Sequence, residues 1–114
     1  MAETTNDPVT GGAAVVDALA AHGVRDVFGI PGTHNLELYR YLPESGIRHV
    51  VTRHEQGAGY AADGYARVSD RPGVLITTSG PGITNAITAL GTSYAVLRSG
   101  KRTFGARITN HDVN

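Results

Sequence analysis

Val74-Leu75-Ile76-Thr77-Thr78-Ser79-Gly80-Pro81-Gly82 is the stretch that decides the fold, because an apolar run passes directly into a glycine-rich turn. Residues 74–78 are rich in apolar and β-branched side chains, which is typical of a strand buried on both faces of a sheet. Residues 79–82 predict a tight turn, since glycine permits unusual φ angles and proline fixes its own. A helix is predicted from residue 83 to about residue 94, so the segment is a strand–turn–helix unit.

The same unit occurs twice more before residue 74. The elements predicted there are, in order, a helix at 13–20, a strand at 24–30, a helix at 35–42, a strand at 47–52 and a helix at 57–69. Thr10 is a suitable N-terminal cap for the first helix, Gly23 ends it, and Pro43 stops the second helix. The last helix of the series is rich in alanine on one side, which indicates close packing against the sheet.

Strands that alternate with helices predict an α/β fold with a parallel sheet, flanking helices and right-handed crossovers. In such sheets, ligands bind beyond the carboxyl ends of the strands. The turns that follow the predicted strands, at residues 29–35, 53–56 and 79–82, are therefore the places to look for a site.

The chain changes character after residue 95. Residues 96–107 carry four of the ten basic residues and no buried-strand run, so we expect three strands followed by an irregular tail. Residues 103–109 are the one candidate strand to cover residues 74–78, because Phe104, Ala106 and Ile108 alternate with polar or small residues. The expected division is a disordered N-terminus at 1–9, a partial domain at 10–95 and a divergent tail at 96–114.

Composition limits both the size of the domain and the classes of partner that it can bind. The 114 residues have room for one small domain, and ten basic and ten acidic residues give a formal net charge of zero. The charges form no basic stripe, which argues against nucleic acid and anionic membranes as partners. Without cysteine, disulfides and thiolate metal sites are excluded. The apolar stretch at residues 13–21 is short and interrupted by Asp17, so it cannot span a bilayer, and we expect a cytoplasmic protein.

Glu55 is the first candidate site residue, because it lies where a predicted strand passes into a helix. One interpretation is an acid at a helix N-terminus, stabilised by the helix dipole. The other is a partly desolvated carboxyl group at the edge of the sheet that shares its proton with a ligand nitrogen. The two interpretations are compatible.

The remaining motifs are less complete. Residues 57–62 fit the dinucleotide pattern G-x-G-x-x-A, but residues 52–56 separate them from the strand and no acid ends the next strand. His54-Glu55 lacks the second histidine of a zinc-protease motif, because Ala58 stands there, and no other spacing suggests a metal. The turns at 29–35 and 79–82 could cradle a phosphate or simply be tight turns. His34 and His49 are interpreted as ordinary surface or edge histidines.

Taken in order, three motifs resemble one enzyme family. They are Phe28-Gly29-Ile30-Pro31-Gly32, then Arg53-His54-Glu55-Gln56-Gly57-Ala58-Gly59, then Thr78-Ser79-Gly80-Pro81-Gly82-Ile83-Thr84-Asn85. Their order and spacing resemble the thiamin-diphosphate enzymes of the acetolactate synthase and 2-oxoacid decarboxylase group, over about residues 10–95. The resemblance identifies this region with the amino-terminal domain that binds the cofactor's pyrimidine ring.

The resemblance also implies roles for particular residues. Glu55 would hydrogen-bond N1′ of the aminopyrimidine and favour the imino tautomer that removes the thiazolium C2 proton, while the cofactor performs the carbanion chemistry. Pro31-Gly32 and Gly80-Pro81-Gly82 would shape the pocket, with Asn85 near its mouth. Tyr65 and Ala66 are interpreted as packing residues of the helix.

Two departures from the family limit this prediction. The family pattern is lost after Ala95, and the Gly-Asp-Gly…Asn motif that holds Mg²⁺ and diphosphate does not occur in this sequence. We therefore expect a truncated pyrimidine-binding domain that is inactive alone, with the Mg²⁺ site on another domain. Its partners would be a 2-oxoacid and either a second copy, as a homodimer, or a second chain with the diphosphate domain. A non-catalytic interaction or regulatory module and a dinucleotide binder remain the alternatives.

Overall fold

The computed structural model describes residues 9–98 and 106–110. Its elements, in chain order, are α1 (Gly11–Ala21), β1 (Asp26–Gly29), the 3-10 turn η1 (Thr33–Asn35), α2 (Leu36–Ser45), β2 (Arg48–Val50), α3 (Glu55–Ser69), β3 (Gly73–Thr77), α4 (Pro81–Arg98) and β4 (Ala106–Asn110). The strands form one parallel sheet in the order β2-β1-β3-β4. The predicted α/β fold with flanking helices is confirmed.

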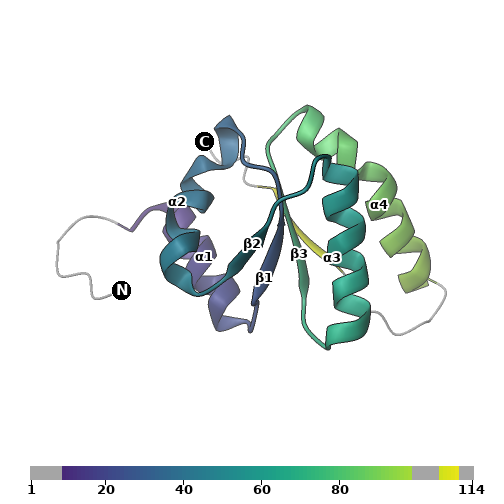
Figure 1. Cartoon of the computed structure of the whole chain (residues 1–114), viewed down its shortest axis with the longest axis horizontal. Helices are drawn as coiled ribbons and strands as arrows, with labels where there is room; N and C mark the ends of the chain where they lie inside the picture. Colours follow the sequence, from purple (N-terminus) through teal and green to yellow (C-terminus); the bar gives the residue numbers. More distant parts are fainter. Residues whose placement is uncertain (1–8, 99–105, 111–114) are drawn as a thin grey trace.

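Two helical layers cover the sheet, with α1 and α2 on one side and α3 and α4 on the other (Figure 1). Alternation along β3 separates two cores, because Val74 and Ile76 face the first layer while Leu75 faces the second. The first core is built from large aliphatic side chains: Val16, Val24, Val27, Leu38, Leu42, Ile47, Val74 and Ile76. The second contains Phe28, Leu75 and three alanines: Ala58, Ala62 and Ala86.

Small residues bring α3 close to the sheet, as the alanine pattern predicts, and also close to α4. Gly59 of α3 faces Ala89 of α4, and a Cβ atom added at Gly59 would lie 2.6 Å from the Ala89 Cβ. Ala58, Ala62 and Ala66 are fully buried on the same helix. Tyr65 packs against this core, its ring meeting Phe28 edge-on at a centroid distance of 5.7 Å. The packing roles expected of Tyr65 and Ala66 are therefore confirmed.

The helix ends agree in part with the predictions. Thr10 caps α1, its Oγ1 accepting a hydrogen bond from the Ala13 amide at 3.1 Å. The predicted stop at Pro43 is wrong, because α2 continues to Ser45 and ends at Gly46, whose φ is +81°. Beyond Pro43, the last turn is closed by Ser45, whose Oγ donates to the Leu42 carbonyl at 2.6 Å and accepts from the Ile47 amide at 3.0 Å.

The other two long helices are longer than predicted. Helix α3 begins at Glu55 rather than at residue 57, so the carboxylate belongs to the first turn. Helix α4 runs from Pro81 to Arg98 rather than over residues 83–94. Proline suits the first position of a helix, because its fixed φ is helical and its missing N–H would have no partner there.

A fourth strand extends the sheet beyond β3. The sequence predicts an irregular tail after three strands, with residues 103–109 as the candidate strand, and β4 (Ala106–Asn110) lies largely within that range. It pairs in parallel with β3 from Gly73↔Ala106 to Thr77↔Asn110. Because β3 is buried along its whole length, its backbone groups need partners on both sides.

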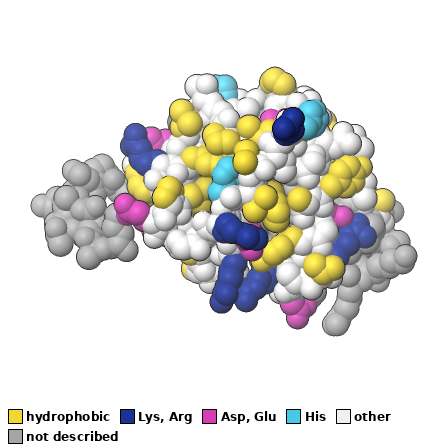
Figure 2. Space-filling model, in the orientation of Figure 1, with side chains coloured by type: hydrophobic (Ala, Val, Ile, Leu, Met, Phe, Trp, Pro, Cys, Tyr) yellow, Lys and Arg dark blue, Asp and Glu magenta, His cyan; other side chains and the backbone are white. Residues whose placement is uncertain are grey.

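The expectations for residues 1–8, 99–105 and 111–114 lie outside the described residues. On the face shown in Figure 2, acidic and basic side chains are interspersed with apolar ones. Among the helices of the described part of the chain, we find none with the length and apolarity that a membrane span requires.

Candidate functional site

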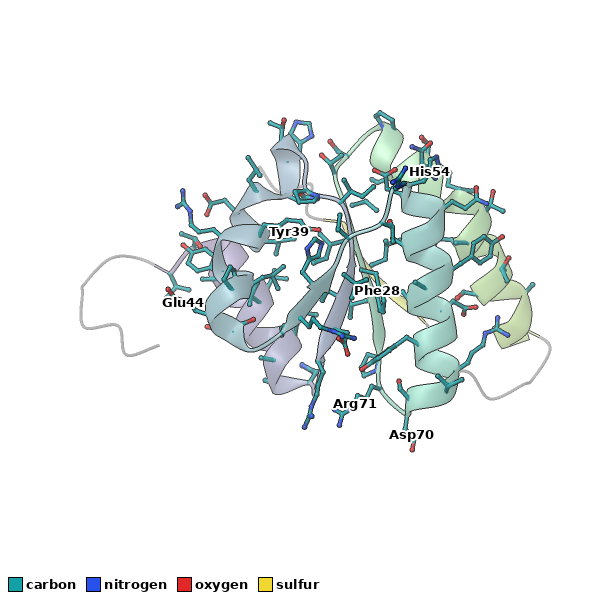
Figure 3. The ribbon with its side chains drawn as sticks, viewed as in Figure 1. Phe28, Tyr39, Glu44, His54, Asp70 and Arg71 are labelled. Carbon is teal, nitrogen blue, oxygen red and sulfur yellow. The ribbon has the colours of Figure 1, made fainter. Side chains whose placement is uncertain are left out.

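The three predicted turns come together at the carboxyl edge of the sheet. His54, labelled in Figure 3, marks the start of α3 at that edge. The turn after β1 contacts the turn after β3, since the His34 amide donates to Thr78 Oγ1 at 3.4 Å. The start of α3, which follows β2, contacts α4, since Asn85 Nδ2 donates to Glu55 Oε1 at 3.1 Å. All three strand ends therefore contribute to one site.

Glu55 is the first residue of α3 and is partly buried. The preceding residue, His54, caps the helix by accepting a hydrogen bond from the Gln56 amide on its Nδ1 atom at 3.0 Å. Thr52 Oγ1 donates to the His54 carbonyl at 2.8 Å and fixes the approach to the helix. The carboxylate thus lies at the positive end of the helix dipole, as the first interpretation of Glu55 requires.

The turn between β3 and α4 passes close to Glu55 without placing a side chain against its carboxylate at Gly82. Gly80 has a φ of +71°, a conformation that favours glycine. A Cβ atom added at Gly82 would lie 2.9 Å from Thr78 Cγ2 and 3.6 Å from Glu55 Oε2. A side chain at position 82 would therefore crowd Thr78 and fill the space next to the carboxylate. Thr77, the last residue of β3, is buried, and its hydroxyl has no hydrogen-bond partner among the described residues.

The turn after β1 is held by Asn35, which the sequence analysis did not select. Its side chain is fully buried, accepts from the Gly32 amide at 2.7 Å and donates to the Ile30 carbonyl at 3.2 Å. This pair of bonds fixes Pro31 and Gly32. A Cβ at Gly32 would lie 2.7 Å from the Thr78 Cβ, so the backbone here needs glycine to approach β3. Asn35 accepts from the Gly32 amide as the third residue of a capping box does, but Gly32 has no side chain for the reciprocal bond, so the sequence carries no capping-box signal for Asn35.

His34 and His49 do more than the sequence analysis assigned to them. His34 is exposed, but its Nδ1 contacts Ser79 Oγ and so joins the turn after β1 to the turn after β3. His49 lies on β2 with Nε2 at 2.9 Å from the Tyr39 hydroxyl and 3.0 Å from the Gly29 carbonyl. Burial raises the pKa of Tyr39 well above its usual range, so the phenol stays protonated in this network.

The structure separates the predicted site residues into two groups. Glu55, Asn85 and Gly82 adjoin one another directly. The other predicted residues lie in the neighbouring turns or at the start of α4: Pro31, Gly32, Gly80 and Pro81. Residues 57–62, the dinucleotide-like pattern, lie inside α3, so they do not form the strand-to-helix turn that such a site needs. Among the described residues, no group of three or more His, Asp or Glu side chains could hold a metal ion.

A cavity of about 400 Å³ lies away from this edge, between the end of α1 and the segments that precede β1 and β3. Its lining is mostly apolar: Val15, Ala18, Leu19, His22, Val24 and Pro72. Because Val24 and Pro72 precede their strands, the cavity is at the amino end of the sheet. It has no carboxylate, so we place the candidate site at the carboxyl edge, where polar groups converge.

Comparison with known proteins identifies the family of this chain. The family model described as thiamine pyrophosphate enzyme, N-terminal TPP binding domain, matches residues 9–96. The chain belongs to the thiamine pyrophosphate enzymes. Thiamine pyrophosphate is the cofactor also called thiamin diphosphate, so the resemblance of the three turn motifs is confirmed.

Curated relatives of this thiamine pyrophosphate enzyme domain carry decarboxylase and synthase names. A probable 2-ketoarginine decarboxylase, AruI, from Pseudomonas aeruginosa is 66% identical over 87 residues, which cover 76% of this chain and 16% of the relative. An acetolactate synthase from Arthrospira platensis is 51% identical over 90 residues, covering 75% and 16%. The acetolactate synthase isozyme 2 large subunit of Escherichia coli is 54% identical over 76 residues, covering 67% and 14%. The chain thus spans about a sixth of the length of these relatives.

Proposed function

We propose that the carboxyl edge of this sheet binds the aminopyrimidine half of thiamin diphosphate in a 2-oxoacid decarboxylase or acetolactate-synthase-like enzyme. One observation carries the proposal. Glu55 presents a carboxylate at the junction of three turns, with Oε1 held by Asn85 and Oε2 beside the bare α-carbon of Gly82. The relative that is 66% identical is named as a probable decarboxylase, which favours decarboxylation of a 2-oxoacid.

The residues present fit a flat heteroaromatic ring. Glu55 Oε2 has no hydrogen-bond partner among the described residues, so it is available to a ring nitrogen. Gly32 and Gly82 carry no side chain, and the turns that contain them lie against Thr78. Glu55 is partly buried, which strengthens a hydrogen bond between its carboxyl group and a ligand.

Each residue of the candidate site has a distinct part in this proposal. When bound, thiamin diphosphate supplies the electron sink for 2-oxoacid chemistry. Glu55 holds and shares a proton with N1′ of the pyrimidine, as a general acid–base group at one atom. Pro31, Gly32, Gly80 and Pro81 shape the space around the ring, and Asn85 lies at its mouth. Asn35 keeps the Pro31-Gly32 turn in place.

The diphosphate end of the cofactor needs other groups. We infer that the Mg²⁺ site and the diphosphate site come from residues outside this sequence, on another domain or on a different chain. Mg²⁺ is held by carboxylates and cofactor phosphates, and no described group of acidic residues provides such a site here. We therefore do not expect the 114 residues alone to release carbon dioxide from a 2-oxoacid.

Exchange of the thiamin C2 proton tests the role of Glu55. In a form where the diphosphate half is supplied, Glu55→Gln should slow the exchange by about 10²–10⁴-fold, because a carboxamide cannot share a proton with N1′. Glu44→Gln is the matched control, since Glu44 is exposed on α2, well away from His54 and the start of α3 (Figure 3). Equal exchange rates in the two variants would leave Glu55 as a helix-terminal acid and refute the proposal.

A further inference from the structure

Asn85 and Glu55 meet although 30 residues separate them in the chain. Glu55 begins α3, and Asn85 lies in the second turn of α4, whose first residue is Pro81. The two helices pack closely, so the Asn85 amide reaches the carboxylate at 3.1 Å from Nδ2 to Oε1. Among the described residues, no other side chain makes a hydrogen bond to this carboxylate.

An asparagine amide restricts what each carboxylate oxygen can do. The NH₂ group only donates hydrogen bonds, so the oxygen that faces it must be an acceptor. Oε1 is therefore poorly placed to carry a proton, because an O–H group there would point at another donor. Oε2 lies next to Gly82, whose added Cβ would be in van der Waals contact with it at 3.6 Å, and none of the described residues donates a hydrogen bond to it. It is the oxygen that can take up or give a proton.

We propose that Asn85 is a positioning residue that reserves Oε1 as an acceptor and directs the exchangeable proton of Glu55 to Oε2. Its effect on a ligand then passes through Glu55, in addition to any contact at the mouth of the site. The identity of the ligand rests on the proposed function. The different roles of the two carboxylate oxygens do not rest on the proposed function, because they are a property of the chain without ligand.

Two substitutions separate this role from simpler ones. Asn85→Asp is nearly isosteric but places a second carboxylate oxygen against Oε1, and two such oxygens can coexist only with a proton between them. That proton is then withdrawn from Oε2. Asn85→Ala removes the donor without introducing a competing acceptor. Thr84→Ala, at the exposed neighbouring position, is the control for changes in this part of α4.

The first readout uses the 114-residue chain without ligand. The side-chain amide signals of Asn85 are assigned by their absence in Asn85→Ala and followed by ¹⁵N–¹H NMR. We expect Glu55→Gln to move these signals strongly, while Glu44→Gln leaves them in place. Unmoved signals in Glu55→Gln would mean that the two side chains do not interact, and would overturn the inference whatever the ligand is.

The second readout uses thiamin diphosphate labelled with ¹⁵N at N1′, at saturating concentration. The N1′ signal should shift most with the unsubstituted chain and with Thr84→Ala, less with Asn85→Ala, and least with Asn85→Asp, which should resemble Glu55→Gln. A direct contact between Asn85 and the ring would instead weaken binding without changing the shift at saturation. If Asn85 only joined the two helices, Asn85→Ala and Asn85→Asp would give the same N1′ shift. Either result would overturn the proposal, whereas no shift even with the unsubstituted chain would contradict the proposed ligand alone.

Discussion

The two helical layers of this domain are packed by different means, although they cover the same sheet. Between α1, α2 and the sheet, the core consists of large aliphatic side chains such as Leu38 and Ile76, which are completely buried. Between α3, α4 and the sheet, alanine and glycine predominate, and Gly59 faces Ala89. Large side chains bury more apolar surface and stabilise the fold, since burial contributes about 25 cal/mol per Å². Small ones allow two helices to approach.

This difference explains where the candidate site lies. The close approach of α3 and α4 brings the first turn of α3 next to the second turn of α4, and this allows Asn85 to reach Glu55. The α1–α2 layer contributes through a turn instead, since Asn35 orders the segment after β1 from within and His34 holds it against the turn after β3. One layer thus stabilises the domain, and the other sets the geometry of the carboxylate.

The largest effect on stability should come from the aliphatic layer. Leu38→Ala is expected to lower the free energy of unfolding by about 2–5 kcal/mol, because it leaves a cavity in a fully buried position. Leu36→Ala is the matched control on the same helix. Because Leu36 is 56% exposed, its replacement should lower the free energy of unfolding much less. Urea unfolding measures both. In the folded fraction, the Asn85 side-chain amide signals should stay unchanged. A change in these signals would show that the α1–α2 layer also affects the geometry of the carboxylate, contrary to this account.

A smaller effect on stability, but a larger one on the site, is expected from Gly59→Ala. The added Cβ would stand 2.6 Å from that of Ala89, so α3 and α4 must separate, at a cost of about 1–3 kcal/mol. Gly64→Ala is the control on the same helix. Its Cβ would meet nothing within 4 Å, and it should stabilise the chain by about 0.5–1 kcal/mol. Only Gly59→Ala should shift the Asn85 amide signals, and equal spectra for the two variants would show that helix spacing does not control the contact.

The fold and the candidate site differ in how much of each the sequence predicts. The order of helices and strands and the place of Glu55 follow from local patterns, because strand–turn–helix units repeat and ligands bind at the carboxyl edge of parallel sheets. The three turn motifs, taken together, led to the family that the comparison confirms. Local patterns did not reveal the role of Asn35, whose bonds form within one turn through a spacing that many loops share. They did not reveal the bonds of His49 either, because these reach Tyr39 and Gly29 on other elements.

Element boundaries were less predictable for physical reasons. Pro43 is a helix breaker by its lack of an N–H group, yet Ser45 and Gly46 complete the last turn of α2 after it. The strand β4 depends on pairing with β3, which lies about 33 residues earlier in the chain according to the register Gly73↔Ala106. The alternating pattern at residues 103–109 indicated its position, but the strand forms because the buried backbone groups of β3 need hydrogen-bond partners on that side.

The most direct test of the account is to map thiamin diphosphate onto the 114-residue chain by amide ¹⁵N–¹H NMR. We predict that the signals that move belong to the carboxyl edge, including Gly32, Glu55 and Gly82, that Glu55→Gln abolishes most of the response, and that Glu44→Gln retains it. Shifts confined to the apolar cavity at the amino end, around Val15 and Leu19, would contradict the central claim. So would an undiminished response at the carboxyl edge in Glu55→Gln.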